Sequence, residues 1–566
     1  MAAYPGDLAA FGKRSATSRN NAFLWAGLAA FALTVLLVNP LRETALDDDF
    51  AYSLTVRHLL ETGNYQTHDW AAPNMLFQAY WGSLFARVLG YSFASLRLST
   101  LVLMLLGLIA FYHLAREHGL DAVPAGLSLL AMFASPLVLR YSFGFNTDIP
   151  FLCCLIIALL LWTRAIGLDS YWMMLLGSVA SAAAILTRQF GIALLIGLLC
   201  VWGLDRDRWR HASLYMVGLA LPTVAAAWQF WYSLSAPSWG MRYASHQLAL
   251  HFGNLGELLT DLLWRPTVIL NYLALFSVPF VLLALIELVI ELRQWHAQRR
   301  RAITLGLASL GVLSLLIGVG ILYGRMAGGR SLLMPYLPWN FGFLLEMGRF
   351  ERGVVTLLTS VGAVLFARLF IRRYALKEWR SEITPKERLL DFVTLCLVLM
   401  HLLYGGIGDT YILVLLPYTL IVVARELQPL LHRFRTVLAL TSLILALTAA
   451  LWTRGLLERE EAWWTAAESA RVAGVEPGAI FGSWVWIFYY SFADYLVDIG
   501  NRTPDNRNDL WYRWLPGRYN RAKFIVTERP IAPSGEEWEV VREVPYRTML
   551  FQVKRVRLVK RLSTSG

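Results

Sequence analysis

Three consecutive carboxylates, Asp47 to Asp49, follow the first long apolar run of the chain, at the point where that run should leave a membrane. A carboxylate beside hydrocarbon pays a large desolvation penalty, so it is usually kept for chemistry, an ion or a charged ligand. Another acid, Asp148 in Thr147-Asp148-Ile149-Pro150, lies at a second predicted exit on the same side. Two acidic sites facing one compartment predict a catalytic site at a membrane surface.

Helix capping is the simpler explanation for these acids. Asp48 precedes a predicted helix and Asp148 precedes the apolar run from Ile149, so each is also placed to satisfy free backbone N–H groups. We favour a catalytic role for at least one acid of the triplet, with Asp48 preferred to Asp49, and a functional role for Asp148. A helix that starts at Asp148 would also point its positive end at the outer cavity, which suits an anion.

Arginines predicted at the same face are candidates for holding a negatively charged group. Arg188 is the strongest, because it lies between two apolar runs with almost no loop, where an unpaired charge is costly. Contact with lipid head groups is the alternative for every one of them. The candidates are Arg57, Arg97, Arg188, Arg242, Arg325 and Arg330.

No metal site is assigned from the sequence. The histidines have no ligand spacing, and the four cysteines lie inside apolar runs, which is typical of packing residues. The carboxylates of Asp48 and Asp148 would suit Mg²⁺ or Mn²⁺ as oxygen ligands, but neither ion is assigned.

The composition is that of a polytopic membrane protein, because 57% of the residues are hydrophobic and only 16% are charged. The net charge of +12 does not indicate nucleic-acid binding, since many cations fall in short loops between apolar runs and therefore report topology. Scanning for runs long enough to cross about 30 Å of hydrocarbon predicts about thirteen spans. The predicted spans are 22–39, 96–114, 121–139, 149–166, 171–187, 190–204, 212–234, 267–290, 303–323, 353–371, 388–404, 411–424 and 434–452.

Clusters of Lys and Arg before the first span and after the sixth, eighth and tenth fall on one face, which is therefore predicted to be cytoplasmic. The opposite, extracytoplasmic face receives the acidic triplet, Asp148 and the C-terminus. The predicted segments are a cytoplasmic N-terminal segment (1–21), a transmembrane domain (22–454) with a long first outer loop (40–95), and a small α/β domain outside the membrane (455–566). The first span is expected to be retained rather than cleaved as a signal. The protein is therefore predicted to be a multi-pass protein of the inner (cytoplasmic) membrane.

The first outer loop has helical patterning of its own. Apolar or aromatic residues recur at helical spacing from Asp48 through Tyr52 to Leu60, so this segment is predicted to be an amphipathic helix in the membrane interface. Asp48 and Tyr52 would share one face of it, and Gly63 would end it. The aromatic stretch from Trp70 to Trp81 is typical of a belt at head-group depth.

The order and placement of these motifs resemble the GT-C-type polyprenyl-phosphate-sugar glycosyltransferases, particularly bacterial relatives of the dolichyl-phosphate-mannose protein mannosyltransferases and of the aminoarabinose lipid A transferase. The motifs are Asp48-Asp49-Phe50-Ala51-Tyr52, Leu96-Arg97-Leu98-Ser99 and Thr147-Asp148-Ile149-Pro150. The family's Lys-Pro-Pro element is absent, and Asp409-Thr410-Tyr411 stands where relatives have Arg-Tyr-x-x-Pro. Substrate identity is therefore not carried over.

The resemblance implies a GT-C-like helical membrane fold with interfacial helices in the first outer loop. It implies transfer of a sugar from a polyprenyl-phosphate donor to a protein, lipid or polysaccharide acceptor, with no required cofactor. Asp48 would be the base of an inverting single displacement, arginines would hold the departing phosphate, and Tyr52 and Gln189 would bind substrate.

Two other classes of protein share this composition. A transporter or lipid flippase would show ionisable or Gly/Pro-broken positions deep within spans, whereas the acids here cluster at span exits. A sensor or scaffold would explain the C-terminal domain but not the acidic loop. The enzyme is therefore the preferred hypothesis, with the transporter as its alternative.

Overall fold

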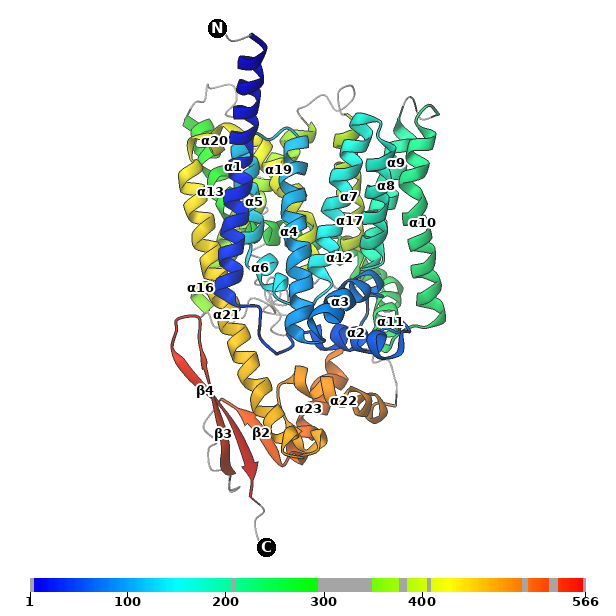
Figure 1. Cartoon of the computed structure of the whole chain (residues 1–566), viewed down its shortest axis with the longest axis vertical. Coiled ribbons are helices and arrows are strands. Elements are labelled where there is room, and N and C mark those ends of the chain that lie inside the picture. Colours follow the sequence, from blue (N-terminus) through cyan, green and yellow to red (C-terminus); the bar gives the residue numbers. More distant parts are fainter. Residues whose placement is uncertain are drawn as a thin grey trace.

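The computed structural model describes residues 5–205, 207, 209–293, 349–375, 384–404, 409–500, 507–528 and 538–562. Long helices run side by side in a bundle, with the N-terminus beyond one end and a small sheet beyond the other (Figure 1). The first half of the bundle consists of α1 (Pro5–Val38), α4 (Phe93–Glu117), α5 (Ala122–Ala134), α6 (Pro136–Ser142), α7 (Asp148–Leu168), α8 (Tyr171–Ile185), η1 (Gln189–Gly191), α9 (Ile192–Leu204) and α10 (Ala212–Ser235).

The second half of the bundle begins with α11 (Trp239–Gly253), which crosses the bundle end. It continues with α12 (Leu255–Phe276), α13 (Val278–Arg293), α16 (Arg349–Ala375), α17 (Pro385–Leu403), α18 (Asp409–Ile412), η2 (Leu413–Leu415), α19 (Leu416–Glu426) and α20 (Gln428–Arg433). Within the described residues, five helices are long and apolar enough to cross a membrane, or seven if each of two bent pairs is one span. The chain is thus a multi-pass membrane protein. The number of thirteen spans stays a prediction, and the predicted span 303–323 lies outside the described residues.

Three of the predicted spans are not single straight helices in the structure. The run 121–139 bends by 66° between α5 and α6, because Pro136 forces the preceding Ser135 out of the helical region. The run 267–290 bends by 100° between α12 and α13, where Pro279 can neither donate a hydrogen bond nor accommodate the carbonyl of Leu275. The run 411–424 is divided by the 3₁₀ turn η2, just before Pro417.

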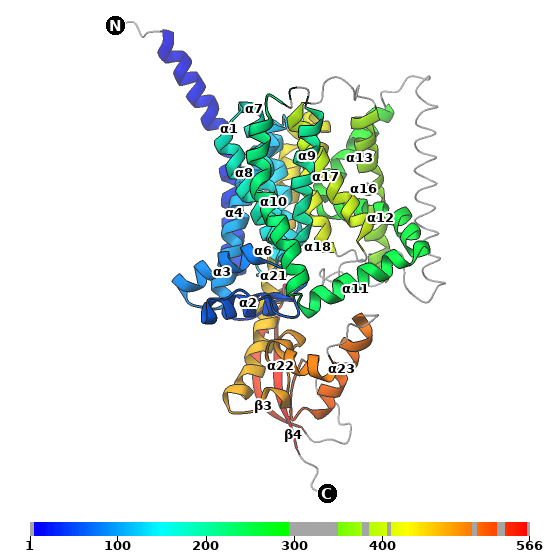
Figure 2. The same cartoon turned by 90° about the vertical axis from the view of Figure 1, so that its right-hand side faces the viewer.

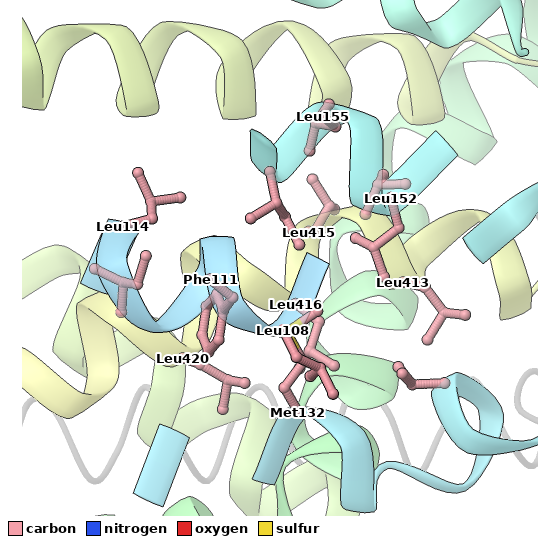
Figure 3. Packing of buried hydrophobic residues seen from close by; sticks show 14 of the residues in the cluster. Leu108, Phe111, Leu114, Met132, Leu152, Leu155, Leu413, Leu415, Leu416 and Leu420 are labelled. Atoms are coloured by element: carbon pink, nitrogen blue, oxygen red, sulfur yellow. The ribbon is translucent and has the colours of Figure 1, made fainter. Parts of the chain in front are cut away.

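The core of the bundle is aliphatic and lies where α4, α5, α7 and α19 meet. Leu108 and Phe111 of α4 face Met132 of α5 and Leu416 of the η2–α19 segment in Figure 3. Side chains from elements about 300 residues apart in sequence therefore close one core. This packing holds α7, whose first residue is Asp148, and α4, which carries Arg97.

Beyond the bundle, α21 (Arg435–Val472) continues as one helix to the C-terminal region (Figure 1). That region contains η3 (Pro477–Ala479), α22 (Trp484–Asp498), α23 (Arg507–Arg521) and four short strands, β1 (Ile480–Phe481), β2 (Phe524–Thr527), β3 (Trp538–Arg547) and β4 (Val553–Arg561). The strand order is β1-β2-β4-β3, with β1 and β2 parallel and the other pairs antiparallel. The domain bounds proposed from the sequence stay predictions.

Two further helices, α2 (Asp49–Thr62) and α3 (Leu76–Leu89), lie across the end of the bundle, between it and the C-terminal region (Figure 2). The predicted helix of the first outer loop is confirmed. It ends at Gly63, whose φ of 73° is readily adopted only by glycine. The acidic triplet therefore stands where the bundle, α2 and the C-terminal region meet.

Candidate active site

Asp48 lies directly before α2 and is half-buried. Its side chain makes no capping hydrogen bond to the helix, which weakens the capping explanation. Instead the indole Nε1 of Trp70 donates a 2.7 Å hydrogen bond to Oδ1 of Asp48. The Trp70 ring is itself packed among aromatic rings, 5.3 Å from Phe488 and 6.4 Å from Trp239 between centroids. The carboxylate is thus held in one orientation while part of it stays accessible.

The neighbouring Asp47 points elsewhere. Its φ of 50° turns the backbone, and its Oδ2 accepts a 2.6 Å hydrogen bond from Arg140 of α6. Adjacent carboxylates of the triplet therefore have separate partners, Arg140 for Asp47 and Trp70 for Asp48.

Asp49 is the most buried of the three acids, with only 1% of its surface exposed. Its carboxyl accepts hydrogen bonds from the backbone N–H groups of Phe145 (2.9 Å) and Leu46 (3.3 Å). Burial raises the pKa of Asp49 to about 8, although the positive charge of Arg97 opposes this shift. Asp49 is thus mostly protonated at neutral pH and has no exposed face. It is better placed to hold the segments of Leu46 and Phe145 together than to abstract a proton.

Asp148 begins α7 and forms a buried ion pair with Arg188, which follows α8. Neither Asp148 nor its cap residue Thr147 makes a capping hydrogen bond. The Arg188 guanidinium also lies over the ring of Tyr411, 4.6 Å from its centroid. One guanidinium is therefore fixed by a carboxylate and an aromatic ring from two other parts of the chain. These two contacts offset the desolvation cost of placing the Arg188 charge near hydrocarbon.

Tyr52 connects the two acidic positions. It lies one helical turn after Asp48, and its electrostatic neighbours are Asp48, Arg188, Asp148 and Tyr411. Burial, reinforced by Asp48, raises the pKa of Tyr52 well above its ordinary value. The phenol therefore remains protonated and can donate a hydrogen bond. We call Asp48, Tyr52, Asp148, Arg188 and Tyr411 the acidic-arginine site.

Arg97 is not part of this site, and its predicted role as a phosphate ligand does not fit the structure. It is 1% exposed, and its guanidinium donates to four backbone carbonyls. The acceptors are Phe143 (2.6 Å), Pro40 and Arg42 (2.8 Å each) and Thr44 (2.9 Å). Arg97 thus ties the segment leading into the acidic triplet to the loop before Asp148.

The remaining candidate cations lie apart from the acidic-arginine site or outside the described residues. Arg57 is half-exposed on α2 and pairs with Glu61 at 2.7 Å, and Arg242 is exposed on α11. Arg325 and Arg330 lie outside the described residues. Gln189 follows Arg188 and is exposed, with Nε2 3.4 Å from the carbonyl oxygen of Ala72. The described residues contain no group of three or more His, Cys, Asp or Glu placed to hold a metal ion.

Sequence reasoning missed Trp70, Tyr411 and Gln78 as residues of the site or its supports. Trp70 was predicted only as part of a head-group belt, and Tyr411 only as a departure from a family motif. Gln78, buried on α3, donates a 2.7 Å hydrogen bond to the carbonyl of Phe145 and so holds the loop that ends at Asp148. A buried amide on an amphipathic helix beside an acidic loop was the available signal.

Comparison with known proteins shows that part of the chain is similar to one protein family. Residues 73–231 match the family model described as dolichyl-phosphate-mannose-protein mannosyltransferase. The chain resembles the glycosyltransferases of this family. The resemblance expected from the sequence is thus confirmed, because the matched family is one of glycosyltransferases. The matched segment includes Asp148 and Arg188 but not Asp48.

Solved structures give a more distant likeness, and no curated protein sequence matches the chain. ArnT from Cupriavidus metallidurans bound to undecaprenyl phosphate is 16% identical with a TM-score of 0.42, covering 96% of this chain and 99% of its own. The oligosaccharyltransferase AglB from Archaeoglobus fulgidus, in complex with an inhibitory peptide and a dolichol-phosphate, is 13% identical with a TM-score of 0.41, covering 89% of this chain and 69% of its own. Similarity at this level carries no weight for the site.

Proposed function

We propose that the chain transfers a sugar from a polyprenyl-phosphate donor to a protein, lipid or polysaccharide acceptor on the extracytoplasmic side of the membrane. The observation that carries the proposal is the juxtaposition of an accessible, oriented carboxylate, Asp48, with the fixed guanidinium of Arg188 through Tyr52. A base and a cation at one membrane surface are the two groups that a lipid-phosphate leaving group and a protic acceptor require.

The proposed chemistry is one displacement. Asp48 takes the proton of an acceptor hydroxyl or amine, which attacks the anomeric carbon as the bond to the lipid phosphate breaks. Arg188 and the Tyr52 hydroxyl hold the phosphate of the bound donor, and they also stabilise the charge that grows on its oxygens as the bond breaks. Attack opposite to the leaving group inverts the anomeric configuration, and no covalent sugar intermediate is formed.

A half-open, mainly apolar pocket of about 750 Å³ between helices of the bundle supports a lipid-linked donor. Its lining includes Pro266 of α12, Leu415 of η2 and the side of α17 from Arg388 to Val398, about 15 Å of helix. Leu415 is four residues after Tyr411, and Pro266 follows Arg265, whose guanidinium bonds the carbonyl of Leu402 at 2.9 Å. The lining of this pocket thus includes η2, which directly follows the helix of Tyr411, and it extends along α17 as an isoprenoid tail would require.

The proposal is tested by incubating the purified protein with radiolabelled polyprenyl-phosphate sugars and with lipid extracts or cell-envelope protein as acceptors. Arg188→Lys keeps a positive charge beside Asp148 but loses the planar guanidinium, which can donate two parallel hydrogen bonds to a phosphate. The KM for the donor should therefore rise about tenfold, with a smaller change in kcat. Arg242→Ala, on the exposed side of α11, is the matched control and should keep the wild-type KM. An unchanged donor KM in Arg188→Lys would move the phosphate site elsewhere.

The proposed orientation can be measured directly. Trp209 lies in the Arg-rich turn between α9 and α10, whereas Val540 lies on β3 beyond the opposite end of the bundle (Figure 1). Both residues are exposed, so single cysteines at these positions in a cysteine-free background should react with an impermeant maleimide. Only Val540→Cys should be labelled in intact cells, and Trp209→Cys only after lysis. The reverse pattern would place the site in the cytoplasm.

We propose that the transfer needs no cofactor, since the lipid phosphate is itself the leaving group. Turnover should be unchanged by EDTA. A loss of turnover that Mg²⁺ or Mn²⁺ restores would instead assign a metal to the site.

A further inference from the structure

A second pocket of about 290 Å³ adjoins the acidic triplet on the side of Asp47. It is formed where α21 leaves the bundle and meets β1 and the start of α22. Its polar lining consists of Asp47, Arg140, Arg459, Glu460 and Ser483, and its aromatic lining of Trp463, Phe481 and Trp484. The pocket shares its wall with the triplet but contains none of the residues of the acidic-arginine site.

The backbone of the triplet separates the two sites. The left-handed conformation of Asp47 sends its carboxylate to Arg140 and the pocket, whereas Asp48 bonds to Trp70. Asp47 lines the pocket and Asp48, the proposed base, is the next residue, so a group held in the pocket lies close to the proposed base. This is the position expected of the molecule that delivers the attacking hydroxyl or amine.

The charges of the pocket are largely paired within the protein. Arg140 pairs with Asp47 at 2.6 Å, and Arg459 pairs with Glu528 at 2.7 Å. Glu460 differs, because it is half-buried in the lining and no hydrogen bond or ion pair with another described residue involves its carboxylate. Arg459 and Arg140 act on Glu460 only through their charges, so among the described residues nothing satisfies its carboxylate oxygens, which need a ligand or water.

Carboxylates and guanidiniums side by side select for a group that both donates and accepts hydrogen bonds. A phosphate would meet the repulsion of Asp47 and Glu460, and an isolated ammonium would meet that of Arg140 and Arg459. Hydroxyls donate and accept equally, and the indoles of Trp463 and Trp484 offer broad apolar surfaces beside them. At about 290 Å³ the pocket is at the small end of ligand sites and has room for a single ring rather than a long chain.

We propose that this pocket binds a neutral saccharide ring of the acceptor, with Glu460 accepting from its hydroxyls and Arg140 donating to them. The proposal rests on the proposed function, and it narrows the acceptor to one that carries a sugar near the attacked position. Glu460 is then an acceptor-binding residue rather than the base.

Binding is measured without donor, by saturation-transfer-difference NMR of the purified full-length protein with a set of methyl glycosides of hexoses and N-acetylhexosamines. At least one glycoside should bind the wild-type protein. Glu460→Gln, which keeps shape but loses charge, and Leu456→Trp, which fills the pocket, should each weaken that glycoside's binding at least tenfold. Glu539→Gln, on the exposed face of β3, and Arg188→Lys should leave it unchanged.

Absence of glycoside binding by the wild-type protein, or equal binding by all variants, would overturn the proposal. Because the assay contains no donor, its outcome is separate from that of the proposed function. Glycoside binding that depends on Glu460, in a protein that turns over no polyprenyl-phosphate sugar, would reject the transferase and leave the saccharide site in place.

Discussion

Asp48→Asn should lower the rate of sugar transfer about 10³-fold while leaving the protein folded in the membrane. Asparagine keeps the shape of the side chain and an oxygen that can accept from Trp70, but it cannot take a proton from the acceptor. The loss should appear in kcat, with little change in donor KM, because Arg188 and Tyr411 are untouched. Single-turnover transfer from a radiolabelled donor measures it.

Asp169→Asn is the matched control for this change. Asp169 ends α7 with a φ of 50°, a conformation that asparagine also tolerates, and its side chain is 73% exposed. It should keep full activity. Asp49→Asn tests the neighbouring acid, and a larger loss of kcat there than in Asp48→Asn would transfer the role of base to Asp49.

Arg97→Leu should be the most destabilising of the substitutions considered. It would remove all four hydrogen bonds that the guanidinium makes to the carbonyls of Pro40, Arg42, Thr44 and Phe143. It would also remove the positive charge near the buried carboxyl of Asp49. Leaving the four carbonyls without partners should cost about 3–5 kcal/mol, so little folded protein should be recovered.

Fluorescence-detected size exclusion and thermal unfolding in detergent measure this effect. Arg57→Leu serves as control, because Arg57 is half-exposed and its ion pair with Glu61 is an (i, i+4) pair of small expected value, although its side chain also bonds to Tyr489. A stable, well-folded Arg97→Leu protein with weakened donor binding would contradict the structural role and restore the phosphate-binding role predicted from the sequence.

Local patterns in the sequence were sufficient to predict α2 and the apolar runs of the bundle. The start of α2 at the acidic triplet and its end at Gly63 depend on helical periodicity and on one glycine, which are local signals. The bends at Pro136 and Pro279 were also local signals, but the apolar runs continue through them. A hydropathy scan therefore registers one span where the backbone makes two helices.

The partners of the site residues could not be predicted in the same way. Arg97 stands in an apolar helix at the right face for a phosphate ligand, and only the fold shows that its acceptors come from the segment 40–44 and from Phe143. Trp70 is equally placed for a head-group belt, yet its indole lies against Asp48 because α22 and α11 pack on its ring. Pairings between residues far apart in sequence leave no trace in periodicity or in a short motif.

The uninterrupted course of α21 has a mechanical consequence. Its 38 residues form one continuous helix about 57 Å long. This helix packs against the bundle helices at one end and against the C-terminal sheet at the other. About two thirds of the way along α21, Glu458 and Glu461 form ion pairs with Arg42, in the segment just ahead of the triplet, at 2.8 and 2.6 Å. A displacement of the C-terminal region, by a docked partner or a tether, would therefore be passed along a rigid helix to the segment that precedes Asp48.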